Sequence, residues 1–444
     1  MNGHDIRPSL VELYARVAAR LDGEPLVRAA LAGVVVGTGA GIDGVTHVLA
    51  LGKVALPMWR GIDRDARAGG DKLKALAVLP APLAPPQAIP GLRVLPSDHP
   101  HPTERAVAAA QDVLAFVRAA RADAGNDARL LVLLSGGTSS LLCAPAGGLS
   151  VADKRAAIAA VAAAGATIGQ LNTVRKHLSQ IKGGRLALAT DVPALVLAMS
   201  DVIGDDPATI GSGPFSPDPT TFADAQRIIA RLGAAVPPTV AAHLEAGARG
   251  LAEESPPPGD RRLDHVRYRV IAGPGDARAE ARRQAAAAGW SIGDLPANTE
   301  FSVEHLATII VDRARAALAK AATAPQLLIG NGEPTIKVTG NGRGGRATHL
   351  ALLVARGLAQ LPETPGAQVA FLAAGTDDRD GNSDVSGAVV DGTTWGRAVA
   401  ENRDPQGAID RCDSASLLAA LSATVRGPGT SNLLDLHFLA VRQR

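Results

Sequence analysis

Short apolar runs alternate with alanine-rich segments of helical period along most of the chain. The runs are nearly continuous in Val, Leu and Ala, which is typical of strands buried on both faces of a parallel sheet. The stretch from Thr103 to Ala122 is a predicted helix, with Thr103 and Glu104 at its start. We therefore predict an α/β fold with a parallel sheet. The strands predicted in the first half are residues 46–52, 73–80, 92–98, 128–137 and 193–202.

A proline-rich segment then separates two series of this kind. Residues 253–262 contain three prolines and a glycine, which suits a linker. We predict an N-terminal Rossmann-like domain over 1–252 and a C-terminal α/β domain over 263–444, and the sequence allows the final segment to return to the N-terminal domain. In the second series we predict a helix at 275–289 and strands at 268–273, 325–332, 335–340, 368–377 and 436–441.

Composition and charge limit the class of protein. The 444 residues carry a net charge of +2 and only 2% aromatic side chains, without a basic stripe, so no nucleic-acid partner is expected. Cys143 and Cys412 form no metal-binding pattern and suggest a reducing compartment. The first 21 residues form a charged amphipathic helix, and no uncharged span of membrane length follows. We expect a cytoplasmic protein without membrane contact, and a homodimer is left open.

The glycine-rich stretch from Gly33 to Gly44 contains a G-x-G-x-x-G pattern at Gly39, Gly41 and Gly44. In a dinucleotide-binding fold such glycines open a helix, whose N-terminus holds the pyrophosphate. Here they lead into the apolar run 46–52, a predicted strand. The pattern is therefore weak evidence for a nicotinamide site, whereas Lys53 at the end of that strand is a stronger candidate for chemistry.

Ligands of open parallel sheets bind beyond the carboxyl ends of the strands, and the loops there are rich in small and charged residues. The loop after residues 128–134 suits an anion, because its small residues expose backbone N–H groups and its hydroxyls donate. A tight turn that needs glycine for its dihedral angles is the alternative. The residues in question are Ser135, Gly136, Gly137, Thr138, Ser139 and Ser140.

Two further loops of the first half carry charge. Arg175, Lys176, Lys182 and Arg185 form either a solvated basic face or a positive wall toward the same anion. At the end of the predicted strand 193–202 and just beyond it stand Asp201, Asp205 and Asp206, which suit Mg²⁺ with a phosphate substrate, or a base that accepts a hydroxyl proton. Turn capping is the alternative for Asp205 and Asp206.

The second half has a comparable set of loops. Arg346 begins an amphipathic helix after a glycine-rich loop, where it could stabilise a transferring phosphoryl group. The loop after 368–375 resembles a calcium loop in composition, but Ser383 stands where an EF-hand needs glycine. The candidates in these loops are Glu333, Lys337, Arg343, Gly344, Gly345, Arg346, Thr376, Asp377, Asp378, Asp380, Asn382, Asp384, Thr430, Ser431 and Asn432. This inventory fits phosphoryl transfer better than hydride transfer, since phosphoryl transfer needs mainly positioning and charge neutralisation.

Eight motifs in this order resemble the glycerate 2-kinase family, the MOFRL-type (class II) glycerate kinases. They are LALGKVALPM, DHPHP, LLSGGTSSLL, LNTVRKHLSQIKGGRLA, SDVIGDDPATIGSGPFSPDPTT, GRGGR, AAGTDDRDGNSD and GPGTSNLLDL. The resemblance covers nearly the whole chain. It implies two α/β domains with the active site in the cleft between them, and ATP- and Mg²⁺-dependent phosphorylation of D-glycerate to 2-phosphoglycerate.

The resemblance also implies roles for individual residues. Lys53 would contact substrate or phosphate, Asp201 would lie by the reacting hydroxyl, and Arg346 would stabilise the transferring phosphoryl group. Asp206 and Asp377 are the candidates for Mg²⁺. The residues expected to bind substrate or phosphate are Ser135, Gly136, Gly137, Thr138, Ser139, Arg175, Lys182, Glu333, Gly344, Gly345, Thr376 and Asp377.

Three alternatives remain open. Thr138, and the run Ala347, Thr348 and His349, depart from the family pattern where the cleft is expected, so the substrate could be a related hydroxy acid. The second is a hydroxypyruvate reductase that uses NAD(P)H, which requires a nicotinamide site. A non-enzymatic sugar or nucleotide sensor is the third, and it predicts ligand binding without turnover.

Overall fold

The computed structural model describes residues 5–32, 44–62, 73–320, 324–362 and 364–443. The chain forms two compact units. We call residues 23–271 the N-terminal unit, and residues 1–22 together with 272–444 the C-terminal unit.

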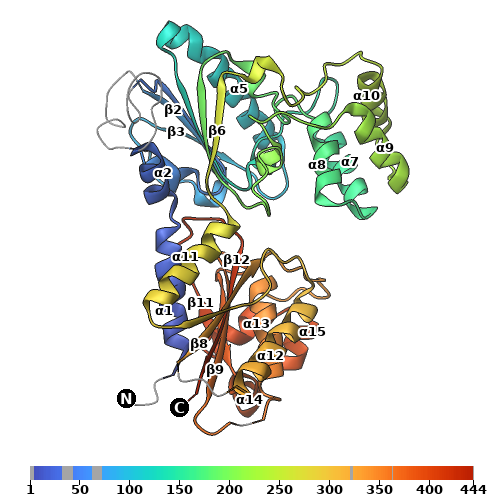
Figure 1. Ribbon diagram of the computed structural model, residues 1–444. Helices are drawn as coiled ribbons and strands as arrows, with labels where there is room; N and C mark the ends of the chain where they lie inside the picture. The colour runs from blue at the N-terminus through green and yellow to red at the C-terminus, as the bar shows by residue number, and fades with distance from the viewer. Residues whose placement is uncertain (1–4, 33–43, 63–72, 321–323, 363, 444) are drawn as a thin grey trace. The chain divides into compact units, whose positions relative to one another are not determined.

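The N-terminal unit is built on a six-stranded sheet in the order β3-β2-β1-β4-β5-β6 (Figure 1). Strands β1 to β5 run parallel, and the order is that of dinucleotide-binding folds, so the predicted Rossmann-like sheet is confirmed. The strands are β1 (His47–Leu51), β2 (Lys74–Pro80), β3 (Arg93–Ser97), β4 (Leu130–Leu134), β5 (Ala194–Met199) and β6 (Val266–Ala272).

Helices cover this sheet and form a second, smaller core beside it. Ala110, Val113 and Val117 of α5 pack on strand residues such as Leu49 and Val132. Helices α7 to α10 pack on one another around a separate apolar cluster and lie together in Figure 1. The helices of this unit are α2 (Gly23–Ala32), α3 (Ala55–Arg60), α5 (Glu104–Ala124), α6 (Thr138–Leu141), α7 (Val151–Ala163), α8 (Ile168–His177), α9 (Phe222–Leu232) and α10 (Pro238–Ala248).

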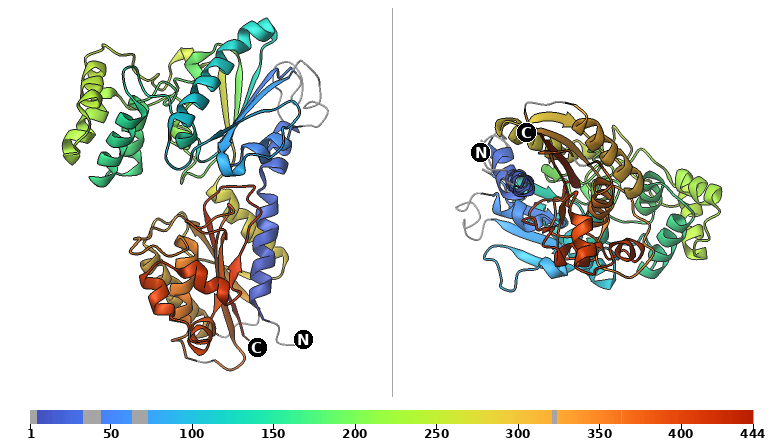
Figure 2. Two further views of the ribbon diagram at one scale, coloured as in Figure 1. Left: turned by 180° about the vertical axis from the view of Figure 1, so that it is seen from behind. Right: turned by 90° about the horizontal axis from the view of Figure 1, so that it is seen from below.

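The C-terminal unit holds a mixed sheet in the order β11-β10-β9-β12-β8-β7. Strand β12 runs antiparallel to both β8 and β9, while β7 and β8 are parallel. Helices α1 and α11 lie on one face of this sheet and α12 and α13 on the other (Figures 1 and 2). The strands are β7 (Ser291–Asp294), β8 (Gln326–Gly332), β9 (Gln368–Gly375), β10 (Gly387–Asp391), β11 (Thr424–Val425) and β12 (Asp435–Arg442). The helices are α1 (Arg7–Arg20), α11 (Pro274–Ala287), α12 (Val303–Leu318), α13 (Arg346–Leu358), α14 (Thr394–Ala400), α15 (Pro405–Asp410) and α16 (Ser414–Ala420).

The units divide the chain differently from the predicted ranges. The segment 253–262 lies inside the N-terminal unit, because β6, which follows it, joins the first sheet beside β5. The N-terminal helix α1 belongs to the C-terminal unit, where it contacts α11. The final segment does not return to the N-terminal unit, since β12 pairs with β8 and β9.

Three local expectations have different outcomes. Residues 335–340 form no strand: Thr335 makes a single bridge to Ser302, and Lys337 to Thr339 are exposed without a neighbouring strand. Of the glycine-rich stretch, residues 33–43, including Gly39 and Gly41, lie outside the described residues. Gly44 stands at a turn before β1, as predicted. In the described part of the chain, no helix has both the length and the apolar character of a membrane span.

Candidate active site

Three predicted site segments follow neighbouring strands of the N-terminal sheet. Lys53 follows β1, the turn 135–138 follows β4, and Asp201 follows β5. These strands are parallel and adjacent, so the three segments share one sheet edge. The strand order reverses between β1 and β4, which is where ligands bind in such sheets. Lys53 and the turn 135–138 therefore flank the topological switch point.

The backbone of Lys53 is fixed against that turn. The Lys53 N–H donates to the Gly136 carbonyl over 2.9 Å. Ser135 Oγ donates to the Leu51 carbonyl (3.0 Å) and accepts from the Val54 N–H (3.1 Å). A Cβ at Gly52 would lie 2.3 Å from Ser135 Oγ, so only glycine allows this approach. The buried Ser135 hydroxyl thus links two strand ends rather than facing a ligand.

Gly137 brings two side chains to the same place. Its φ is +85°, in the left-handed region, and a Cβ there would lie 3.2 Å from both Lys53 Cγ and His99 Cδ2. The stem of Lys53 and the ring of His99 therefore lie against Gly137. Sequence reasoning gave His99 no role, although the DHPHP motif contains it. Thr138 is buried, and its hydroxyl donates to the Ser135 carbonyl (2.7 Å).

The aspartates after β5 differ in their surroundings. Asp201 is half-buried two residues beyond the strand. Asp206 is exposed and caps a turn, since its carboxylate accepts from the Ala208 N–H (3.1 Å) and the Thr209 hydroxyl (2.7 Å). Asp205 has a φ of +54°, and its buried Oδ1 has no hydrogen-bond partner in the described structure. The predicted metal role of Asp206 stays a prediction, and the capping alternative has geometric support.

The four basic residues of α8 and the loop after it differ in their contacts. Lys182 Nζ donates to the Ser139 carbonyl (2.8 Å) and Oγ (3.0 Å), and Arg175 donates to Asn172 Oδ1 (3.2 Å). Burial lowers the pKa of both Lys182 and Arg175. Lys176 instead makes a buried ion pair with Asp218 (2.6 Å). Arg185 donates to Ser255 (2.6 Å) and lies over the Phe222 ring. Of these four residues, Lys182 contacts the predicted anion loop directly, through Ser139, whereas the hydrogen bond of Arg175 goes to Asn172 of its own helix.

In the C-terminal unit, Arg346 is held by two carboxylates. Its Nε and Nη2 donate to the two oxygens of Asp435 over 2.7 and 3.2 Å, and Nη1 donates to Glu333. Asp435 is buried at the start of β12, while Glu333 is exposed after β8. Although burial opposes its charge, the two carboxylates raise the pKa of Arg346. The guanidinium is therefore charged and fixed in orientation, and 31% of the side chain stays exposed.

A carboxylate of the protein itself, that of Asp380, caps the N-terminus of α13. The buried Asp380 carboxylate accepts from the N–H groups of Gly345 (3.0 Å), Ala347 (3.0 Å) and Thr348 (2.8 Å). The Gly344 N–H donates to Asn382 Oδ1 (2.9 Å). The backbone donors of Gly344 and Gly345 are thus engaged within the unit, so the phosphate-binding role predicted for them lacks free donors.

Thr376 and Asp377 follow β9 beside this helix. The Thr376 hydroxyl donates to the Leu434 carbonyl (3.0 Å) and accepts from the Leu433 N–H (2.6 Å), so it joins β9 to the loop before β12. A Cβ at Gly375 would lie 2.9 Å from Asp377 Oδ1 and 3.3 Å from Asp435 Oδ1, which places both carboxylates over this glycine.

Tyr14 of α1 contacts Gly375, the glycine next to these two carboxylates. Its hydroxyl donates to the Gly375 carbonyl over 2.5 Å. Burial, with a smaller contribution from the charges of Asp377 and Asp435, raises its pKa.

The departures from the family pattern at the start of α13 lie inside the protein. Ala347, Thr348 and His349 are all buried. Ala347 belongs to the apolar core of the C-terminal unit, and the Thr348 hydroxyl contacts Asp380 (2.6 Å) and Ser414 (2.9 Å). Ala347 and Thr348 therefore serve packing and capping, which gives no support to an altered substrate.

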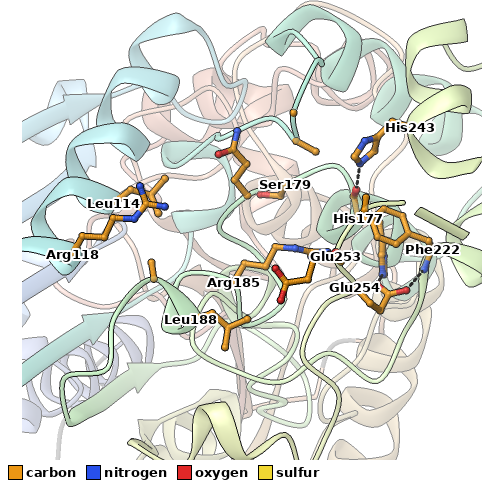
Figure 3. A pocket seen from close by; sticks show the side chains of 15 residues that line it. Leu114, Arg118, His177, Ser179, Arg185, Leu188, Phe222, His243, Glu253 and Glu254 are labelled. Carbon is orange, nitrogen blue, oxygen red and sulfur yellow. Dashed lines mark hydrogen bonds and ion pairs between the residues drawn. The ribbon is translucent and has the colours of Figure 1, made fainter. Parts of the chain in front are cut away.

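A cavity of about 340 Å³ lies elsewhere in the N-terminal unit, lined by residues such as Leu114, Arg118, Leu188 and Phe222 (Figure 3). Of the candidate residues named from the sequence, Arg185 lines it. Figure 3 shows its polar residues bonded to one another: His177 and the Phe222 N–H contact Glu254 over 2.9 and 2.8 Å, and His243 contacts the His177 carbonyl (3.0 Å). With these groups already satisfied, the cavity is a weaker candidate for chemistry than the sheet edge.

Comparison with known proteins identifies both parts of the chain. Residues 10–245 match a family described as a domain of unknown function (DUF4147), and residues 326–435 match the MOFRL family. A protein of Agrobacterium vitis named "putative hydroxypyruvate reductase" is 36% identical, over 79% of this chain and 77% of its own. A glycerate 2-kinase of Pyrococcus horikoshii is 30% identical, over 91% of this chain and 89% of its own.

A solved structure agrees with these matches. The crystal structure of a glycerate kinase from Thermotoga maritima superposes with a TM-score of 0.80 at 27% identity, over 98% of this chain and 99% of that one. The chain therefore belongs to the glycerate 2-kinase family, with a DUF4147 and a MOFRL part.

Proposed function

We propose that the protein is a glycerate 2-kinase, which transfers the terminal phosphoryl group of ATP to the 2-hydroxyl of D-glycerate. The observation that carries the proposal is that Lys53 and the loop 135–139 flank the switch point of a Rossmann-order sheet, with Asp201 after the next strand, β5, in a chain of this family. The set offers a cation, the partly exposed hydroxyl of Ser139 and a carboxylate, which is what phosphoryl transfer requires.

Each residue has a distinct task in this proposal. The ammonium of Lys53 binds an anionic oxygen of the substrate or of the phosphate. Asp201 accepts the proton of the reacting hydroxyl. Arg346 stabilises the charge on the transferring phosphoryl group, and its contacts with Asp435 and Glu333 keep the guanidinium oriented. The position of the active site in a cleft between the two domains stays a prediction.

Magnesium suits the aspartates of both units. Among the described residues no cluster of three or more His, Cys, Asp or Glu forms a metal site, but Mg²⁺ with a nucleotide needs only one or two carboxylates. Asp205, with its unpartnered buried oxygen, and Asp377 beside Asp435 fit this requirement better than the turn-capping Asp206. A bound Mg²⁺ would neutralise phosphate charge.

The name of the Agrobacterium vitis relative favours a second candidate, hydroxypyruvate reduction with NAD(P)H. In a Rossmann fold the dinucleotide fingerprint occupies the turn after the first strand. Here that turn reads Gly52, Lys53 and Val54, and it leads into the six-residue helix α3. One glycine and a lysine do not make that fingerprint, so the kinase is the better supported function.

One experiment separates the two activities. Purified protein is assayed for ADP formation with D-glycerate, ATP and Mg²⁺, and in parallel for NADH or NADPH oxidation with hydroxypyruvate. We expect ADP release that depends on D-glycerate, with 2-phosphoglycerate as the product. Nicotinamide oxidation without ADP release would overturn the proposal, and ligand binding without either reaction would favour the sensor.

A further inference from the structure

Lys154 is a buried lysine that the activity proposed above does not use. It lies in the first turns of α7 with 5% of its surface exposed. Its Nζ is inaccessible and has no hydrogen-bond partner in the described structure. An unpaired buried ammonium is costly, and proteins normally pair such groups or neutralise them.

A neighbouring lysine shows how this unit treats a structural cation. Lys176 on α8 is equally buried, but Asp218 accepts from its Nζ over 2.6 Å. Lys154 and Lys182 have no such carboxylate: Lys182 reaches only the oxygens of Ser139, and Arg175 only the amide oxygen of Asn172. Among the described residues, Lys154, Lys182 and Arg175 therefore have no carboxylate as a hydrogen-bond partner.

The charges of these residues act on one another. Lys154 and Arg175 both disfavour the charge on Lys182, and Arg175 and Arg185 disfavour the charge on Lys154, while the Cys143 thiol has the opposite effect. Burial, followed by these charges, lowers the pKa of Lys154 to about 8 and that of Lys182 well below its usual value. On α8 and α10, which pack against α7, the other ionisable groups are engaged: Lys176 with Asp218, His177 with Glu254, His243 with the His177 carbonyl, and Glu245 with Arg249.

We propose that Lys154, Arg175 and Lys182 form, with Ser139, a subsite for a phosphate group, in which Lys154 is the buried cation. Ser139 and Arg175 are partly exposed and can be reached, whereas Lys182 and Lys154 are buried. A carboxylate would bring one negative charge to three cations, while a phosphate group brings two. The phosphate belongs either to the nucleotide or to the phosphorylated acid. The subsite adds to the proposed kinase function, but phosphate binding can be measured without turnover.

The test is equilibrium binding of inorganic phosphate, ADP and 2-phosphoglycerate to the full-length protein and to Lys154→Met, which keeps the length of the side chain without its charge. We expect phosphate binding to weaken at least tenfold, or about 1.4 kcal/mol. Lys154→Arg should restore part of it, and Lys320→Met, at an exposed lysine of the C-terminal unit, should bind as the wild type does. Whichever of ADP or 2-phosphoglycerate loses affinity is the source of the phosphate, and unchanged binding of all three would overturn the subsite.

Thermal stability distinguishes this role from a structural one. Removing an unpaired buried charge should leave the melting temperature of the ligand-free Lys154→Met variant unchanged or raise it. A lower melting temperature with unchanged phosphate affinity would instead assign Lys154 to the fold alone. If the kinase assay fails while phosphate affinity still depends on Lys154, the proposed function is wrong and the subsite stands.

Proton uptake on phosphate binding can be measured on the wild-type protein alone. A bound phosphate favours protonated lysine, so binding near pH 8 should take up protons, measured by calorimetry in buffers of different ionisation enthalpy. Phosphate binding without proton uptake would contradict the proposal even if every Lys154 variant failed to fold.

Discussion

Lys53 combines a fixed backbone with a side chain at the switch point, so at the residue scale its charge can be tested separately from the fold. Lys53→Met should lower turnover by well over tenfold, the scale for loss of one charge-stabilising contact, with little change in unfolding midpoint. Lys74→Met is the matched control: Lys74 begins the adjacent strand β2 at the opposite edge and pairs with Asp123 (2.7 Å). Turnover close to the wild type in Lys53→Met would remove its assigned role.

Arg346 depends on the shape of its guanidinium as much as on its charge. Lysine cannot donate to both oxygens of Asp435 and to Glu333 at once, so Arg346→Lys should also lower turnover more than tenfold. The loss of charge-assisted hydrogen bonds should reduce the unfolding free energy by about 2 kcal/mol in Arg346→Ala. Arg343→Lys, three residues earlier at an exposed pair with Asp384, controls for the loop. Steady-state kinetics and urea unfolding give both quantities, and equal kinetics in the two lysine variants would contradict this role.

The sequence indicated which residue types in which loops are candidates for the site, but not which groups their side chains contact. Lys53 and Arg346 stand out because each is a charged residue beside glycines in a predicted loop, and Arg175 and Lys182 because they belong to one basic segment. Lys154 gave no such signal, because a lysine in an alanine-rich helix is usually exposed, and its burial depends on how α7 packs. The predicted ligand roles of Ser135 and Thr376 could not be separated from structural ones, since their hydroxyl partners are distant in the chain.

At the scale of elements, the start of α13 depends on the loop after β9. Both oxygens of the Asp380 carboxylate accept hydrogen bonds from N–H groups there, three in all. In asparagine one of these oxygens is replaced by an NH₂ group, which donates and cannot accept. Asp380→Asn should lower the unfolding free energy by about 1–2 kcal/mol, as other helix-capping substitutions do. Urea unfolding measures this, with the half-buried Asp378→Asn as the neighbouring control. Equal midpoints for the two variants would mean that the Asp380 contacts do not stabilise the helix.

The strands of the N-terminal sheet could be predicted because each is an apolar run buried on both faces. β1 and β4 are buried at every position. The second sheet was harder to predict. Residues 335–340 alternate like a strand but lack a neighbour, whereas β11 is two residues long and exists only because it pairs with β10. Pairing between segments remote in sequence decided these elements, and local pattern does not report it.

At the scale of the whole molecule, each unit has its own apolar core. His437 lies on the central strand β12 of the C-terminal unit, fully buried, and neither ring nitrogen has a hydrogen-bond partner in the described structure. Burial lowers its pKa from the usual 6.5 to about 4. The ring is therefore neutral in the folded protein at neutral pH.

This histidine should make the C-terminal unit sensitive to acid. Between pH 6.5 and about 4 the unfolded chain binds the proton and the folded one does not, so stability falls as the pH is lowered through this window. The displaced pKa corresponds to about 3 kcal/mol, since one pKa unit is about 1.4 kcal/mol. His437→Leu should remove that loss from urea unfolding curves across the window, while His305→Gln, at an exposed position of α12, should retain it. If His437→Leu lost as much stability in acid as the wild type, this ring would not govern the acid sensitivity of the unit.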